Sequence, residues 1–233
     1  HTVLRSPSSK FFYIVKNWNG SPSLLKMIER YSRKELKKIW TDENKYKIWL
    51  DIELAAAEAM EKLNIIPKGV VNKVKSKAKI NVARILKIEE SVKHDVIAFL
   101  TSITEKVGKE ARFLHKGMTS SDVLDTCFNL QLKQSGEILL NDIKILLISI
   151  RKQALKHKKT LCIGRSHGIH AEPITFGLKM LTFYQEFLRN KKRLKDSIDE
   201  ISTCAISGAV GTFANIDPRV EKYVAKKLKL KIE

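Results

Sequence analysis

The chain has 233 residues, a formal charge of +19 and a hydrophobic fraction of 43%, which is enough apolar material for a folded domain with its own core. No apolar run approaches the ~20 residues of a membrane-spanning helix, so none is expected. Only 5 prolines and 10 glycines are present, and this scarcity favours long helices over a fold built from many turns.

The first 26 residues differ from the rest, because they carry four basic residues, no acidic one and no amphipathic period. A transit peptide has a similar composition, but a helix-compatible sequence begins at Met27. We therefore expect residues 1–26 to be a disordered tail, either translated upstream sequence or a cloning remnant.

Two helices are predicted in the first half of the chain. Thr41 is a good N-cap residue, and apolar residues then recur at helical spacing until Pro67 marks the stop. The core face would be formed by Ile48, Trp49, Ile52, Ala55, Ala56 and Ala59. Residues 89–107 predict a second helix with Gly108 as its C-cap.

Two long helices are predicted in the second half. Residues 121–157 keep a helical period with no proline and one glycine, and at ~1.5 Å per residue they would span roughly 50 Å. Residues 175–203 predict the other helix. Such a pair indicates a bundle completed by other subunits. The predicted fold is all-α, with an N-terminal helical domain (27–118) and an incomplete long-helix bundle domain (119–233).

The basic excess comes mostly from lysine, since 10 of the 44 basic residues are arginine and aromatic residues make up only 7% of the chain. Nucleic-acid sites more often concentrate arginine and interleave aromatic rings. We therefore expect a lysine-rich solvated surface that attracts anions such as phosphorylated nucleotides, with no specific nucleic acid and no membrane among the partners.

The cysteines Cys127, Cys162 and Cys204 lie far apart and lack CxxC spacing. An odd number of cysteines whose spacing suggests no disulfide is typical of a protein in a reducing compartment. The sequence therefore predicts a cytoplasmic protein.

Residues 117–122, Gly-Met-Thr-Ser-Ser-Asp, immediately precede the first long helix. One of their side chains can cap the helix. The surplus hydroxyls and the unpaired N–H groups of a helix N-terminus also suit a carboxylate or phosphate. The segment therefore predicts a cap, and it is also a candidate anion site.

Four histidines lie in polar stretches, namely His94, His115, His167 and His170. Each alone could be a surface or core residue. Residues 164–173, GRSHGIHAEP, predict a loop shaped by two glycines and a proline, in which His, Arg and Glu gather. Histidine is the natural proton donor or acceptor near neutral pH. Zinc at His167 and His170 is the weaker reading, because no cysteine or HExxH motif accompanies them, and we expect no metal.

Five motifs follow one another in the order found in one family. They are MIERYSRKELKKIWTDENKYKIWLDIELAAAEA from residue 27, KHDVIAFL from 93, GMTSSDVLDT from 117, GRSHGIHAEPITFGLK from 164 and SGAVGTFANIDPRVE from 207. Together they resemble the N-terminal half of the adenylosuccinate lyases, within the superfamily that includes fumarases and argininosuccinate lyases. The resemblance covers essentially all of residues 27–233.

The resemblance implies an all-α homotetramer in which three subunits share each active site. It implies β-elimination of fumarate from adenylosuccinate, giving AMP, and from the succinyl-aminoimidazole-carboxamide ribotide of purine biosynthesis. A base removes a proton beta to the leaving nitrogen, and an acid protonates the departing amine. The succinyl carboxylate accepts the transient charge, so no cofactor is implied.

The resemblance also assigns roles to individual residues. His167 is similar to the family's general acid, and His94 supports charge and orientation beside the substrate. Contacts with the substrate are implied for Arg30, Tyr31, Asp95, His115, Thr119, Ser120 and Ser166. Arg30 and Tyr31 would bind the phosphate, and Thr119 and Ser120 a succinyl carboxylate. Lys116 and Ser166 depart from the family pattern, and His170 is expected to shape the loop.

A third family signature, SSxMPxKxNP, supplies the catalytic serine base and does not occur in residues 1–233. We expect the chain alone to have negligible lyase activity. A helix rich in Lys226, Lys227 and Lys229 is expected to lead onward past Glu233.

Two other readings stay open. One is a different fumarate-releasing lyase of the superfamily. The other is a non-catalytic basic helical scaffold or nucleic-acid binder, against which the histidine-bearing segments count.

Overall fold

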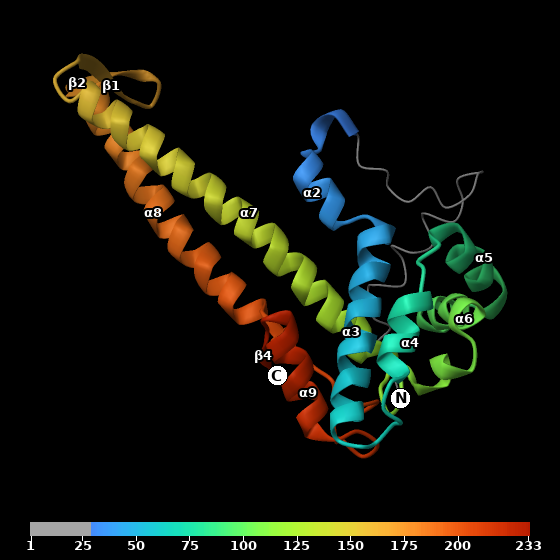
Figure 1. The fold of residues 1–233 in the computed structure, drawn as a ribbon. Coiled ribbons are helices and arrows are strands. Elements are labelled where there is room, and N and C mark those ends of the chain that lie inside the picture. Colours follow the sequence, from blue (N-terminus) through green and yellow to red (C-terminus); the bar gives the residue numbers. More distant parts are fainter. Residues whose placement is uncertain (1–28) are drawn as a thin grey trace, which may run out of the picture. The chain divides into compact units, whose positions relative to one another are not determined.

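A computed structural model describes residues 29–233, and the expected tail 1–26 lies outside the described residues. The chain divides between Lys37 and Lys38 into two units. Within the first unit the structure describes the short 3-10 helix η1 (Glu29–Tyr31) and the start of α2 (Lys34–Ile39). All the elements that follow belong to the second unit (Figure 1).

The core of the second unit is built on α3 (Asp42–Lys62), which begins as predicted at Thr41. The Thr41 side chain accepts the N–H of Asn44 at 3.2 Å, and Asp42 and Glu43 suit the positive end of the helix dipole. All six residues expected on the core face are buried. Tyr46 and Trp49 of this helix pack with Phe99, with ring centroids 5.1–5.9 Å apart.

Shorter helices surround α3: α4 (Val70–Lys77), α5 (Val82–Val92), α6 (Asp95–Val107) and the 3-10 helix η2 (Lys109–Phe113). The prediction of one helix over residues 89–107 was wrong. Lys93 adopts a left-handed conformation (φ 56°) that ends α5, and His94 caps α6. Gly108 ends α6 as expected.

The two long helices are confirmed as α7 (Ser120–Lys156) and α8 (Phe176–Ile201). They lie side by side and are joined by a hairpin at the end of the pair farthest from α3 (Figure 1). Gly177 allows the close approach at the joined end, because a Cβ there would lie 2.5 Å from the carbonyl oxygen of Ala154.

The loop predicted over residues 164–173 is instead part of a β-hairpin. Strand β1 (Leu161–Ser166) pairs antiparallel with β2 (Ile169–Thr175), leaving His167 and Gly168 as its two-residue turn. Both turn residues have positive φ, 48° and 78°, as a type I′ turn requires, and histidine and glycine tolerate this region. The strands were not predicted, because the glycines and proline of this segment favoured a loop over a pattern of alternating strand side chains.

The last elements return to α3. They are β3 (Thr203–Cys204), α9 (Pro218–Leu228) and β4 (Lys231–Ile232), and β3 pairs parallel with β4. The expectation that a lysine-rich helix leads onward was wrong, because Lys229 is left-handed (φ 56°) and ends α9.

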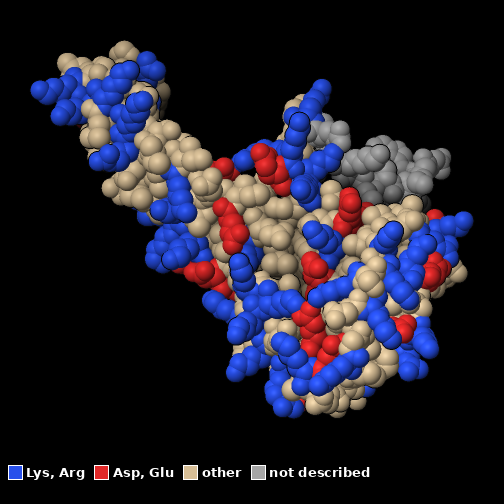
Figure 2. Space-filling model, viewed as in Figure 1, with Lys and Arg blue, Asp and Glu red and all other residues tan. Residues whose placement is uncertain are grey.

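The all-α fold class is therefore confirmed, with short strands added to a helical framework. Among the described residues no helix is long and apolar enough to cross a bilayer. Lysine and arginine side chains are spread over the visible face (Figure 2), as the composition predicted.

Candidate functional site

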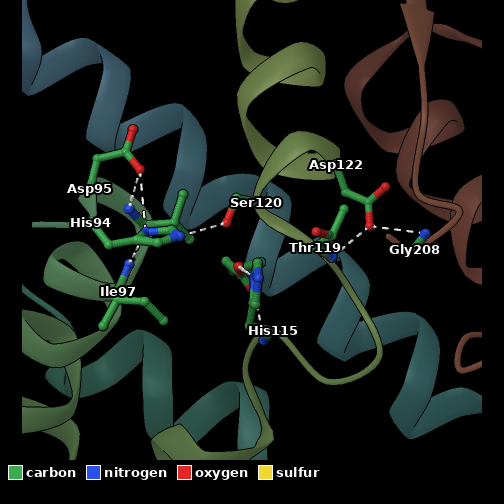
Figure 3. Close-up of polar contacts among 10 residues, drawn as sticks. His94, Asp95, Ile97, His115, Thr119, Ser120, Asp122 and Gly208 are labelled. Atoms are coloured by element: carbon green, nitrogen blue, oxygen red, sulfur yellow. Dashed lines mark hydrogen bonds and ion pairs between the residues drawn. The ribbon is translucent and has the colours of Figure 1, made fainter. Parts of the chain in front are cut away.

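The N-terminus of α6 presents His94 and Asp95. The Nδ1 atom of His94 accepts the N–H of Ile97 at 3.4 Å, so a neutral ring carries its proton on Nε2. That Nε2 atom lies 3.4 Å from the hydroxyl of Ser120 (Figure 3). The Asp95 carboxylate accepts its neighbour's N–H, that of Val96, at 2.7 Å, and lies 3.5 Å from Nδ1 of His94.

The N-terminus of α7 lies opposite that of α6 and carries Thr119 and Ser120, both half-buried. Asp122 accepts the N–H of Thr119 at 2.9 Å, which confirms the predicted helix cap. Its carboxylate also accepts the N–H groups of Ser207 at 3.0 Å and Gly208 at 3.2 Å. Asp122 thereby ties the start of α7 to the segment after β3 (Figure 3).

His115 reaches the same region from the turn before α7. Its backbone is left-handed (φ 57°), and both its N–H and its ring Nδ1 lie 2.7 Å from the two carboxylate oxygens of Glu53. Glu53 lies on α3 and its side chain is fully buried. Burial alone lowers the pKa of His115, but the hydrogen bond and charge of Glu53, with the charge of Asp122, raise that pKa above its ordinary value.

These contacts bring together five of the nine predicted site residues: His94, Asp95, His115, Thr119 and Ser120 (Figure 3). Two helix N-termini, which carry partial positive charge, meet there beside hydroxyls and imidazoles. This arrangement suits an anionic group, since N–H donors at helix N-termini bind carboxylate and phosphate, and the imidazoles can transfer protons at neutral pH.

His167 and Ser166 are not part of this cluster within one chain. They lie exposed on the hairpin, as does His170. The hairpin follows the far end of α7, and the 37 residues of that helix span about 55 Å. One chain therefore cannot bring His167 to its own His94.

Arg30 and Tyr31 lie on η1 in the first unit. Both are exposed, and the Arg30 guanidinium lies 4.9 Å from the centroid of the Tyr31 ring. The exposed guanidinium keeps its donors accessible for a bidentate contact with an anion.

No group of three or more His, Cys, Asp or Glu residues with the geometry of a metal site occurs in residues 29–233. His167 and His170 of the hairpin therefore belong to no such group among the described residues.

Sequence reasoning missed Glu53 and Asp122, whose carboxylates organise the cluster. Glu53 does carry a signal, because it is an acidic residue at helical spacing from Trp49 and Ala56 on the core face of α3. An acid at such a position requires a buried partner. Asp122 was read only as a possible cap, and its second role depends on a segment 85 residues away.

Comparison with known proteins shows the family of the chain. A family model described as "Lyase" (Lyase_1) matches residues 29–233. The chain is 52% identical over 204 residues to a protein named adenylosuccinate lyase from Synechocystis sp.. It is 48% identical over 205 residues to one of the same name from Bacillus subtilis.

Both matches cover 88% of the chain, but the chain spans about half the length of these curated relatives (47% and 48%). Among solved structures, a fumarate lyase from Mesorhizobium sp. BNC1 superposes with a TM-score of 0.80 at 24% identity. That match covers 84% of this chain and 48% of the other. At this identity the likeness concerns the fold.

Proposed function

Because the chain belongs to the lyase family whose model matches residues 29–233, we propose that it acts as an adenylosuccinate lyase. The reaction is β-elimination of fumarate from adenylosuccinate, giving AMP, and from the related succinyl ribotide of purine biosynthesis. The observation that carries the proposal is the 48–52% identity to two adenylosuccinate lyases over 88% of the chain.

The reaction needs a site for anions and a means of moving protons. In the proposed mechanism the N-terminus of α7, with Thr119 and Ser120, binds a succinyl carboxylate through N–H and hydroxyl donors. Arg30 and Tyr31 bind the phosphate. Asp95, His115 and Ser166 also contact the substrate.

The proton transfers are divided between two groups. A base removes the proton beta to the leaving nitrogen, the electrons form the double bond of fumarate, and the C–N bond breaks. His167 protonates the departing amine, while His94 orients the substrate through Nε2. The base is expected in the signature that does not occur within residues 1–233, so we expect these residues alone to release negligible fumarate.

The active site is proposed to combine residues of several copies of the chain. The support is the length of α7, about 55 Å, which separates His94 from His167 in one chain. The same helices expose large apolar side chains: Phe128, Leu139, Ile145, Ile148, Leu155, Leu178, Leu181 and Phe183. Figure 2 shows uncharged residues over much of the visible face of this pair. Exposed apolar surface of this extent is typical of an interface.

We propose a homotetramer in which the long helices of residues 119–233 contribute to a shared bundle, while residues 27–118 form the N-terminal helical domain. A cytoplasmic location is supported by the free thiols of Cys127, Cys162 and Cys204.

The test is to express the complete coding sequence that contains residues 1–233 and to offer it adenylosuccinate, argininosuccinate and the succinyl ribotide separately. The proposal expects fumarate from adenylosuccinate and the ribotide. Fumarate from argininosuccinate alone would instead assign the other lyase reading. Salt-sensitive RNA binding without fumarate release would favour the scaffold reading.

A further inference from the structure

Glu53 is a fully buried carboxylate on a helix face that otherwise packs the core. Its Oε2 accepts the backbone N–H of His115 and its Oε1 lies against the ring Nδ1, each at 2.7 Å. A buried charge is costly unless it is paired and hydrogen-bonded. Here both oxygens are directed to one residue, 62 positions away in the chain.

The contact fixes which ring nitrogen of His115 bears a proton. A carboxylate accepts hydrogen bonds and cannot donate them, so Nδ1 must carry hydrogen. The Nε2 atom is then the ring nitrogen left for other partners, on a side chain that keeps 17% of its surface exposed. The two bonds also hold His115 at φ 57°, a left-handed conformation that is unfavourable for a non-glycine residue.

A purely structural role would not need both oxygens. Glu61, two turns farther along α3, accepts the backbone N–H of Val71 at 2.7 Å through one oxygen, which anchors the first turn of α4 without contacting a titratable ring. Glu53 does the same for the backbone of His115 through Oε2 and has a second contact with the ring through Oε1.

We propose that Glu53 is a positioning residue for His115, holding the imidazole with its proton on Nδ1 and presenting Nε2 to an anionic group of the substrate. The part that concerns the substrate rests on the proposed function, whereas the orientation and protonation of the ring do not. Glu53 acts through His115 and is itself buried away from any ligand.

The surrounding charges favour a cationic ring. Burial lowers the pKa of His115, but Glu53 from α3 and Asp122 from α7 together raise it. The adjacent Lys116 does not compete, because its Nζ donates to the carbonyl of Ile65 at 3.3 Å. The uncharged hydroxyl of Ser120 on α7 contacts His94 of α6 and adds no charge beside the His115 ring. An imidazolium at this point would present an Nε2–H donor to a carboxylate or phosphate.

The test is a pH titration of the ¹⁵N-labelled chain by long-range ¹H–¹⁵N NMR of the imidazole rings. The six histidines are distinguished by comparison with His115→Asn, since asparagine tolerates positive φ. Spectra are compared for the wild type, Glu53→Gln and Glu61→Gln. The last variant is the matched control, because it alters a carboxylate that binds only a backbone N–H.

We expect the neutral His115 ring of the wild type to carry its proton on Nδ1. We also expect the pKa of His115 to fall in Glu53→Gln and to stay unchanged in Glu61→Gln. An Nε2-protonated neutral ring in the wild type would overturn the proposal, and so would an unchanged His115 pKa in folded Glu53→Gln. If Glu53→Gln does not fold, the tautomer of the neutral His115 ring in the wild type is sufficient to test the proposal. Because no readout depends on fumarate release, the result is separate from the fate of the proposed function.

Discussion

The carboxylate of Asp122 accepts the backbone N–H of Gly208, 86 residues farther along the chain, at 3.2 Å. The same side chain binds Ser207 and Thr119, so one buried carboxylate organises both the start of α7 and the segment after β3. This relationship connects two of the motifs that identify the family and shows why an acid follows the hydroxyl residues.

Replacing Asp122 with asparagine should destabilise the chain. The amide keeps the shape of the side chain, but its NH₂ group would face N–H donors in place of an acceptor oxygen. Leaving buried donors unpaired costs about 1–3 kcal/mol, and we expect the free energy of unfolding in urea to fall by this amount. Asp125→Asn is the control, because Asp125 is exposed on the same helix. Equal stabilities of the two variants would disprove the bridging role.

Gly117 should tolerate alanine less well than Gly69 does. Both have positive φ, 73° and 88°, which costs alanine about 1–2 kcal/mol. At Gly117 a Cβ would also lie 2.1 Å from the carbonyl oxygen of Asn215, whereas at Gly69 nothing lies within 4 Å. We therefore expect Gly117→Ala to lose more unfolding free energy than Gly69→Ala. Equal losses would mean that the segment at Asn215 moves away without cost.

Glu58 should make stability depend on acid pH. It accepts hydrogen bonds from Lys75 of α4 at 2.5 Å, and from Tyr223 and Lys227 of α9. Burial raises its pKa, but the hydrogen bonds from Lys227 and Lys75 outweigh this and lower the pKa to about 2 from 4.5. Because the folded-state pKa is depressed, the stabilisation is present above pH 4.5 and is lost as the pH falls toward 2.

The comparison is between the wild type and Glu58→Gln, with urea unfolding followed over a range of pH. We expect the variant to be less stable at neutral pH and the difference to shrink as the pH falls through this window. Glu137→Gln serves as a control on an exposed helix position. A stability difference that does not change with pH would show that the ionised carboxylate is not the cause.

Asparagine at position 94 should separate the structural role of His94 from its chemical role. Asparagine is among the best N-cap residues, so His94→Asn keeps the cap of α6, whereas His94→Ala loses about 1 kcal/mol of stability. In the complete protein we expect His94→Asn to lower the rate of fumarate release by about 10²-fold or more, because the substrate is no longer held in its reactive position. A stable His94→Asn enzyme with the wild-type rate would remove His94 from the mechanism.

The regular elements were the part of the fold that the sequence could predict. The helix after Thr41 and the two long helices were predicted because their apolar residues recur at helical spacing over many residues. A single residue that does not fit the spacing does not hide so long a pattern. The break between α5 and α6 depends instead on Lys93 adopting a left-handed conformation, which nothing in its side chain favours. The hairpin turn was hidden because the glycines and proline of its motif also suit an irregular loop.

For the site, the sequence supplied the histidines and hydroxyls but not their supports. His94 and Ser120 are 26 residues apart, and only the fold, which brings the N-termini of α6 and α7 near one another, makes them neighbours (Figure 3). Glu53 and Asp122 act through backbone N–H groups distant in sequence. A short motif does not show which distant backbone groups a side chain will contact. The separation of His167 from His94 follows from the length of α7, which the sequence did predict.

The central claim is that His94 and His167 act in one active site but come from different copies of the chain. It is tested most directly by mixing His94→Asn and His167→Asn forms of the complete protein, dissociating them and allowing them to reassemble. Each variant alone should release fumarate at least about 10²-fold more slowly than the wild type. In equal mixtures random assembly gives about one site in four with both histidines, so fumarate release should return. If oligomers verified to contain both variants stay inactive, the claim is wrong.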